Sequence, residues 1–412
     1  MTGSRIFFVI LTFCLIIVGW STVYRAAWDN IQRTDYSVYI AAGQAVIDHT
    51  NIYAAQNVRG WRYVYPPPFA ILMVPLAQLP ASIGSFIWFL LEIVAIAASS
   101  LMSVALLKDI NFSNKKYLLY ALPLLSLCVL LVSGVMRCQA SAFMFCLIIA
   151  AFYFNFNNKP VYAGLSLAGA ILIKVFPATL MIYFFIRKKW NMLAATVIGL
   201  FLFSFVLPSL VWGWQQNIDN ILGWIDVVGH PTLASNAVRA QISPIYEQLL
   251  DTTKARNQSL ESLFLAIDIP CHLVNYFVAT TGLFMLAMMW FGATKVKNYF
   301  DELMLCSAFI VWALLITPIS ETHYFGALIL PITVLFAYIL HYNYDPKAQS
   351  FLIVSGTCVM LLVMILIGID EIALMRPLSI ISLAIWALLI GLIFKQPQNQ
   401  VVDVNDNSLQ PA

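Results

Sequence analysis

The chain has 412 residues, of which 61% are hydrophobic and only 10% are charged, and its mean hydropathy is +0.85. A soluble domain usually carries roughly 25% charged residues, so the composition excludes an ordinary soluble protein and predicts a polytopic membrane protein. The net charge of +3 is small and the basic residues are scattered, which argues against nucleic acid as a partner.

The apolar runs predict the membrane segments, because a helix needs about 20 apolar residues to cross a bilayer. The first run follows MTGSR without a clear small-residue cleavage site and is expected to be an uncleaved anchor helix. The polar tail 395–412 is expected to be disordered, which leaves one transmembrane domain over residues 1–394. The runs that qualify, or nearly so, are 6–23, 82–107, 117–135, 140–156, 192–210, 270–293, 302–318, 323–341, 350–368 and 376–394.

A further stretch, VYAGLSLAGAILIKVFPATLMIYFFI at 161–186, is interrupted by Lys174 and Pro177 and could form one kinked span or two short ones. Short cytoplasmic loops carry an excess of Lys and Arg. If the N-terminus is cytoplasmic, the basic loops, including RKKW at 187–190, all fall inside only when this stretch crosses twice. We therefore expect two half-length segments that break near Lys174, about 12 membrane segments in total (roughly 10–13), and both termini in the cytoplasm.

Two long loops, residues 24–81 and 211–269, then lie on the outer side. Their many Tyr and Trp residues suit the headgroup level, so the loops are expected to contain interfacial helices. In the first loop, apolar residues recur with a helical period after Asp35, and Asp35 or Thr34 is suited to cap that helix. A cap does not preclude a chemical role, because a carboxylate at a helix start can also face a cavity.

The predicted topology gathers polar residues at the outer ends of apolar segments: Arg137, Gln139, Lys174, Glu321 and His323. A lysine inside an apolar run is a functional candidate, although snorkelling to the interface also explains it. For the histidine, a satisfied helix-end position is the alternative. A carboxylate together with the Arg, Lys and His side chains of this set suits a reaction in which an acceptor hydroxyl loses a proton while a phosphate leaves.

Several motifs resemble those of glycosyltransferase family 87, the polyprenol-phosphate-sugar-dependent enzymes of the GT-C superfamily. TDYSVYIAAGQAVIDHTNIY at 34–53 and YVYPPPFAILMVPLAQLP at 63–80 resemble its N-terminal signature. The resemblance continues through AGLSLAGAILIKVFPATL, NQSL and TPISETHYFGALILP. Two positions depart from the family pattern: Cys138 precedes Gln139 where a Gly-Gln pair is expected, and Glu321 stands where relatives often have an aromatic residue.

The resemblance implies an all-α GT-C type bundle and an inverting displacement that needs no metal or other cofactor. It implies that Asp35 is the general base for the acceptor hydroxyl and that Lys174 and His323 lie near the donor phosphate. It also implies an outer loop that closes on the site. The full set of candidates is Asp35 as catalytic residue, Lys174, His323 and Arg137 at the donor phosphate, and Gln139, Tyr65, Asn257, Gln258, Ser259 and Glu321 as substrate-binding residues.

We therefore expect a membrane glycosyltransferase that moves a hexose, such as mannose, from a polyprenyl-phosphate donor to a lipid or glycan acceptor. Its expected location is the plasma (inner) membrane, with the active face periplasmic or extracellular. Two alternatives stay open. A transporter or flippase of lipid-linked sugars would need working charges near mid-membrane, where Glu92 and the Lys174 region are the candidates. A non-catalytic scaffold that retains the fold is the other.

Overall fold

The computed structural model describes residues 3–31, 33–107, 116–341 and 346–395. This described part is helical, and its only β-pairing consists of two isolated bridges, one of which joins Asn257 to Glu321. The prediction of an all-α polytopic membrane protein is confirmed. The predicted tail 395–412 lies outside the described residues apart from Lys395, which ends the last helix.

Seven helical segments of the described chain are long and apolar enough to cross a membrane, or eight if one bent pair counts as a span. The bent pair, α5 and α6, is angled by 59°. Five of the seven segments are single helices: α4 (Ala81–Ala105), α16 (Cys271–Lys295), α17 (Tyr299–Ile316), α19 (Pro346–Leu366) and α21 (Pro377–Lys395). The other two are α10 (Trp190–Phe201) continued by η3 (Leu202–Val206) and α11 (Leu207–Trp212), and η6 (Thr322–Leu328) continued by α18 (Ile329–His341). The bent pair is α5 (Lys116–Ser126) and α6 (Cys128–Met136).

The count of about 12 segments is not confirmed. Several of the predicted apolar runs form helices whose described apolar part is shorter than a full span. The helices whose described apolar stretch is shorter than a span are α1 (Gly3–Ala27), through its part Leu11–Ala27, α2 (Tyr36–Ile47), α3 (Pro67–Ala77), α7 (Ser141–Phe156), α8 (Pro160–Ile173), and η2 (Phe176–Leu180) continued by α9 (Met181–Ile186).

The stretch 161–186 folds as the predicted pair of half-length segments. Helix α8 ends at Lys174, whose backbone is extended (φ −147°, ψ 135°), and a 3-10 turn leads into α9. Both ends of this hairpin lie beside the start of α17: the Phe156 ring is 5.2 Å from that of Tyr299, and Arg187 forms an ion pair of 2.7 Å with Glu302. The chain therefore enters the bundle, turns at the lysine and returns to the level where it started.

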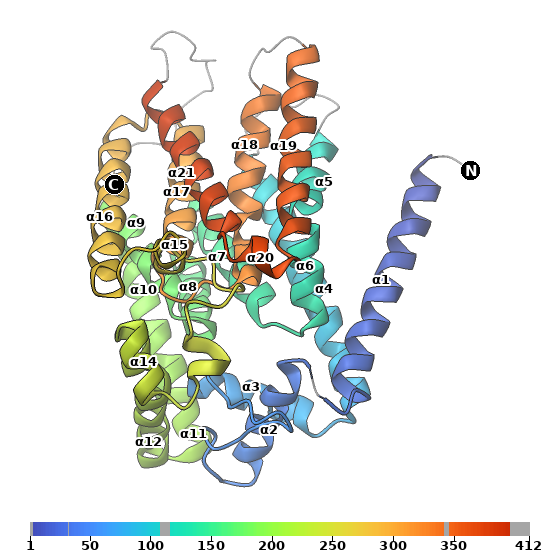
Figure 1. Ribbon diagram of the computed structural model, residues 1–412, viewed down its shortest axis with the longest axis vertical. Helices are drawn as coiled ribbons and strands as arrows, with labels where there is room; N and C mark the ends of the chain where they lie inside the picture. Colours follow the sequence, from blue (N-terminus) through green and yellow to red (C-terminus); the bar gives the residue numbers. More distant parts are fainter. Residues whose placement is uncertain (1–2, 32, 108–115, 342–345, 396–412) are drawn as a thin grey trace.

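The two long loops lie together at one end of the molecule (Figure 1), opposite to the end where α1 begins and α21 ends. They contact each other directly, since Trp224 Nε1 donates to Val64 O (3.2 Å) and Arg62 N donates to Gln248 Oε1 (2.7 Å). As predicted, both loops contain short helices. The second loop contains α12 (Trp214–Trp224), η4 (Ile225–Gly229), α13 (His230–Leu233), α14 (Asn236–Ile242), η5 (Tyr246–Leu250) and α15 (Leu260–Ala266). One more short helix, α20 (Asp370–Ala373), lies in the turn between α19 and α21.

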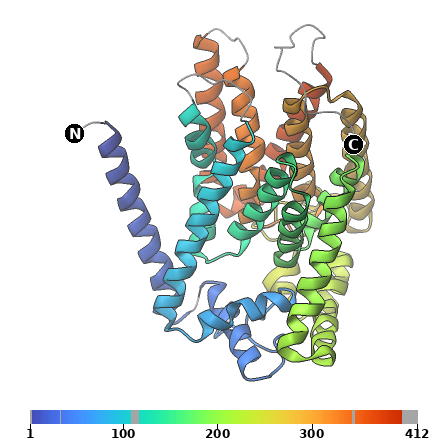
Figure 2. The same ribbon diagram turned by 180° about the vertical axis from the view of Figure 1, so that it is seen from behind.

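The core centres on α17, whose residues from Leu303 to Leu315 are all buried, and on η6 with α18 behind it. Helix α1 stands at one side of the molecule and α10 at the other (Figures 1 and 2). Both expose large apolar side chains such as Phe13 and Phe201, as expected of surfaces that face lipid. The element that carries Glu321 and His323 is thus held rigidly at the centre.

Candidate active site

Asp35 immediately precedes α2, and its position is set by the turn between α6 and α7. Its N–H donates to Arg137 O (3.0 Å), and Gln139 Nε2 donates to its Oδ2 (2.5 Å). The prediction that Asp35 or Thr34 caps the helix through its side chain is wrong, because the helix start has no side-chain cap hydrogen bond. Gln139 binds the carboxylate instead, and the carboxyl group lines a cavity.

Cys138 has a left-handed backbone in the turn that presents Gln139 (φ +53°). This conformation favours glycine, because a Cβ atom crowds the neighbouring carbonyl. Cys138 occupies the position where the family resemblance leads us to expect Gly before Gln. The backbone requirement gives that glycine a physical reason, and this chain meets it with a fully buried cysteine.

Lys174 reaches into the same cavity from the break between α8 and η2. Its Nζ donates to Tyr324 Oη (2.8 Å) and lies 4.0 Å from the centre of the Tyr324 ring and 5.3 Å from that of Tyr65. Tyr65 is hydrogen-bonded through its hydroxyl to Tyr39 (2.9 Å), on the helix that Asp35 starts. The ammonium is therefore positioned by aromatic rings, and no carboxylate of the described residues forms an ion pair with it.

Glu321 forms the facing wall, next to the η6 turn. One of its oxygens lies 3.1 Å from Arg256 Nε, and the other lies 3.4 Å from His323 Nε2. Arg256 also donates to the backbone oxygen of Gln248. The long outer loop and the start of the η6 segment are thus joined at one carboxylate.

Asn257, Gln258 and Ser259 are buried beside this wall and do not appear among the cavity-lining residues. Asn257 Oδ1 accepts from Ser320 N (3.0 Å), Gln258 N donates to Ser320 O (2.7 Å), and Ser259 Oγ donates to Pro318 O (3.0 Å). Their side chains and backbone hold the segment that ends in Glu321.

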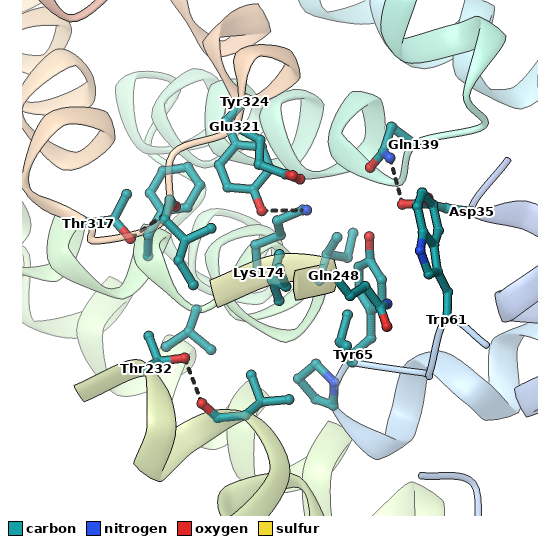
Figure 3. Close-up of a pocket in the computed structure, with 18 of the residues that line it drawn as sticks. Asp35, Trp61, Tyr65, Gln139, Lys174, Thr232, Gln248, Thr317, Glu321 and Tyr324 are labelled. Atoms are coloured by element: carbon teal, nitrogen blue, oxygen red, sulfur yellow. Dashed lines mark hydrogen bonds between the residues drawn. The ribbon is translucent and has the colours of Figure 1, made fainter. Parts of the chain in front are cut away.

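The cavity has a volume of about 760 Å³. Asp35, Gln139 and Trp61 lie at one end, and Thr232 and Thr317 lie at the other, with Lys174 between them (Figure 3). Those two threonine hydroxyls donate to the backbone of neighbouring residues Val228 (2.6 Å) and Ile319 (3.4 Å). Both threonine hydroxyl protons are thus used within the protein, and Val228 and Ile319 line the cavity beside them. Other apolar residues that line the cavity include Val175, Phe176, Ile225, Leu233 and Leu249.

Burial raises the pKa of the Asp35 carboxyl from an ordinary value of 3.8 to about 6, and the negative charge of Glu321 adds to the rise. Three groups act in the opposite direction on this pKa: Lys174, the hydrogen bond from Gln139, and Arg137. A carboxyl with a pKa near 6 is ionised at neutral pH yet is a stronger base than an ordinary aspartate. Among the described residues, no group of three or more His, Cys, Asp and Glu side chains could hold a metal ion.

Comparison with known protein families gives a match to the model of Glycosyltransferase family 87 over residues 63–318. The chain belongs to glycosyltransferase family 87. The resemblance seen in its motifs is thereby confirmed, and the protein is a membrane glycosyltransferase. The matched range of this family 87 chain includes Tyr65, Arg137, Gln139 and Lys174, and it ends just before Glu321.

No curated protein matches this family 87 chain. Among solved structures, ArnT from Cupriavidus metallidurans, determined bound to undecaprenyl phosphate, aligns at 12% sequence identity and a TM-score of 0.42. That alignment covers 96% of the present chain and 76% of ArnT.

The structure of the family 87 chain brings most of the predicted site residues into one cavity: Asp35, Tyr65, Arg137, Gln139, Lys174, Glu321 and His323. Sequence reasoning did not single out Tyr324, Trp61 or Gln248, which also line it. Tyr324 directly follows His323, so its place in the same motif was a signal that could have identified it. Gln248 had no signal of its own, because its place depends on how the two loops pack.

Proposed function

We propose that this protein transfers a sugar from a polyprenyl-phosphate donor to an acceptor hydroxyl by inverting, metal-independent displacement. One observation carries the proposal: the Asp35 carboxylate, bound by Gln139, and the Lys174 ammonium, bound by Tyr324, line the same cavity although they are far apart in the sequence. A base and a cation so placed match the two charges that change in glycosyl transfer from a phosphate.

In this reaction, Asp35 accepts the proton of the acceptor hydroxyl. The hydroxyl oxygen then forms a bond to the anomeric carbon of the donor sugar, on the face opposite to the phosphate. The bond between that carbon and the phosphate oxygen breaks, so the configuration inverts. The raised pKa of Asp35 supports this assignment, because general bases work best when their pKa lies near the operating pH.

The phosphate leaves with an additional negative charge, which fixed cations stabilise. Lys174 is placed for this role in the middle of the cavity, and Arg137 lines it beside Asp35. His323 lines the same wall as Glu321. We assign these three residues to the donor phosphate, as the family resemblance implies.

The apolar residues that line the cavity suit the prenyl chain of the donor. Val175 and Leu233 line the cavity and are also 48% and 86% exposed, so an apolar path runs from the molecular surface to Lys174. A chain of isoprene units that entered there would leave its phosphate next to the ammonium. The donor class implied by the family thus agrees with the shape and lining of the site.

The sugar is proposed to be a hexose, such as mannose, bound between Tyr65 and Glu321. The acceptor is a lipid or glycan. Asn257, Gln258 and Ser259 would position Glu321 through the hydrogen bonds described above. We propose that the end with the two long loops faces the periplasm or cell exterior of a plasma membrane and that both termini are cytoplasmic.

A test in detergent separates this function from transport of lipid-linked sugars, because transport has no meaning without a sealed membrane. Purified protein would be incubated with radiolabelled polyprenyl-phosphate hexoses and membrane lipid extract, and labelled products would be separated. Transfer of label to an acceptor or to water, with release of polyprenyl phosphate, is expected. An intact donor after incubation with every hexose would contradict the proposal.

A further inference from the structure

Three arginines from the N-terminal part of the chain line the cavity: Arg25, Arg33 and Arg59. Arg25 lies in the last turn of α1, and Arg33 lies two residues before Asp35. Arg59 belongs to the turn that also carries Trp61, the residue drawn next to Asp35 in Figure 3. The part of the chain that supplies the base therefore also supplies a set of guanidinium groups.

The protein supplies few negative charges to neutralise these arginines. In the described part of the chain, no carboxylate lies within ion-pair distance of Arg25 or Arg59, and the Arg59 guanidinium lies 4.1 Å above the Trp61 ring. Arg33 pairs with Asp29 at 3.2 Å, but its side chain is 55% exposed, so that pair is weak. The guanidinium groups are available to a ligand.

The donor alone does not account for this charge. A sugar-phosphate-polyprenyl diester carries one negative charge, and the departing phosphate carries up to two. Lys174 and Arg137 already match that charge, and Arg256 is matched by Glu321. Arg25, Arg33 and Arg59 are therefore cations in excess, and they come from the part of the chain that supplies Asp35, the base that the acceptor hydroxyl must reach. Arginine is the residue best suited to bind phosphate, because its planar fork donates two parallel hydrogen bonds.

We propose that Arg25, Arg33 and Arg59 form an anion subsite that binds a phosphate group of the acceptor. This proposal rests on the proposed function, since it takes Asp35 as the base that the acceptor hydroxyl must reach. It narrows the acceptor to a phosphate-bearing sugar or lipid whose hydroxyl lies next to its phosphate. The stacked Arg59 and Trp61 pair would present a sugar-binding surface beside that phosphate.

Binding of a soluble probe tests the subsite without a donor sugar. The full chain would be placed in phosphatidylcholine nanodiscs and saturated with farnesyl phosphate, which occupies the cations at Lys174. Glucose 6-phosphate, glucose and glucuronate would then be titrated by calorimetry. We expect glucose 6-phosphate to bind at least tenfold more tightly than glucose, because hydrogen bonds to a charged group are stronger than those to a neutral one.

Two variants locate the effect. Arg25→Gln with Arg59→Gln should abolish the preference for glucose 6-phosphate while leaving farnesyl phosphate binding unchanged. Arg62→Gln is the matched control, because this arginine follows closely on the same turn but does not line the cavity; it should bind both ligands as the parent does. Thermal unfolding of each variant confirms that it is folded.

Equal binding of glucose and glucose 6-phosphate by the parent chain would overturn the proposal, and so would unchanged binding by the double variant or displacement of the sugar phosphate when phosphatidylglycerol replaces a quarter of the bilayer. The last would show that the arginines bind bilayer headgroups. Tighter binding of glucuronate than of glucose 6-phosphate would likewise exclude a phosphate subsite. None of these results depends on glycosyl transfer, so failure here and failure of the proposed reaction are distinguishable.

Discussion

Gln139 Nε2 lies 2.5 Å from Asp35 Oδ2, although the two residues are separated by 104 positions in the chain. The contact connects the loop after α1 to the turn between α6 and α7. It is reinforced by the backbone hydrogen bond from Asp35 N to Arg137 O (3.0 Å). The α6–α7 turn therefore holds Asp35 through both its backbone and its carboxylate, and the orientation of the carboxylate in the cavity depends on this turn.

Gln139→Leu should impair the base through its pKa. The amide hydrogen bond stabilises the ionised carboxylate, so its loss should raise the pKa of Asp35 above about 6. The acidic limb of kcat/KM against pH should move to higher pH, and activity at pH 7 should fall about tenfold. A profile that keeps its midpoint would show that the amide does not act on the carboxylate.

Glu321→Gln should shift the same limb in the opposite direction. The negative charge of Glu321 raises the pKa of Asp35, and its removal also frees the positive charge of Arg256. Both changes stabilise ionised Asp35, so its pKa should fall and the enzyme should retain activity at lower pH. The parent protein should lose about tenfold in kcat/KM per unit below pH 6. An unchanged midpoint in the variant would contradict this electrostatic coupling.

Cys138→Gly should preserve activity and leave the free energy of unfolding within about 1 kcal/mol, since relief of a left-handed backbone (roughly 1–2 kcal/mol) offsets the lost packing. Cys138→Val should be clearly destabilising, because a β-branched residue is a poor fit at a positive φ. Thermal unfolding in detergent and the transfer assay would measure both. Equal stability of the two variants would show that the positive φ at position 138 does not restrict which residue is accepted there.

Lys174→Met should reduce kcat/KM by about 10²-fold or more, because a cation that meets the leaving phosphate contributes mainly in the transition state. Tyr324→Phe keeps the ring beneath the ammonium and removes only the 2.8 Å hydrogen bond, so the expected loss is smaller, about tenfold or less. Steady-state kinetics with varied donor would measure both losses. A larger effect of the tyrosine change would assign the phosphate contact to the hydroxyl.

Charge patterns in the sequence were sufficient to predict the hairpin at Lys174. Lys174 and Pro177 interrupt the apolar stretch, which left one kinked span or two short ones, and only the double crossing keeps the basic RKKW segment on the expected cytoplasmic side. The same topology brought Arg137, Gln139 and His323 to one end of the bundle, where the structure has them. The break and the shared location are therefore confirmed, while the sidedness of the membrane stays a prediction.

Side-chain direction was harder to predict. Asp35 has the position of an N-cap, but its carboxylate binds an amide that is distant in the chain, and no local pattern could have indicated that partner. Asn257, Gln258 and Ser259 belong to a recognisable motif, yet their hydrogen bonds go to backbone groups near Ser320. A motif identifies residues that matter without saying whether they touch the substrate or hold those that do.

The count of about 12 spans is not confirmed for a related reason. Helices α7 and α8 are mainly apolar, but they have 16 and 14 residues and pack largely against other helices. Hydropathy alone does not distinguish a buried short helix from one that faces lipid. Only the packing shows that such segments support the cavity.

The central claim is that Asp35 takes the proton of the acceptor. The decisive measurement is sugar transfer from a polyprenyl-phosphate donor by the purified parent protein and by Asp35→Asn, with Asp48→Asn, an aspartate outside the main cavity, as control. Because the folded state raises the pKa of Asp35, ionisation lowers stability as pH rises from about 4 to 6 and above. The variant should therefore unfold at pH 7 no more easily than the parent. We predict that it binds donor but transfers at least 10³-fold more slowly; transfer at the parent rate by the folded variant would contradict the account.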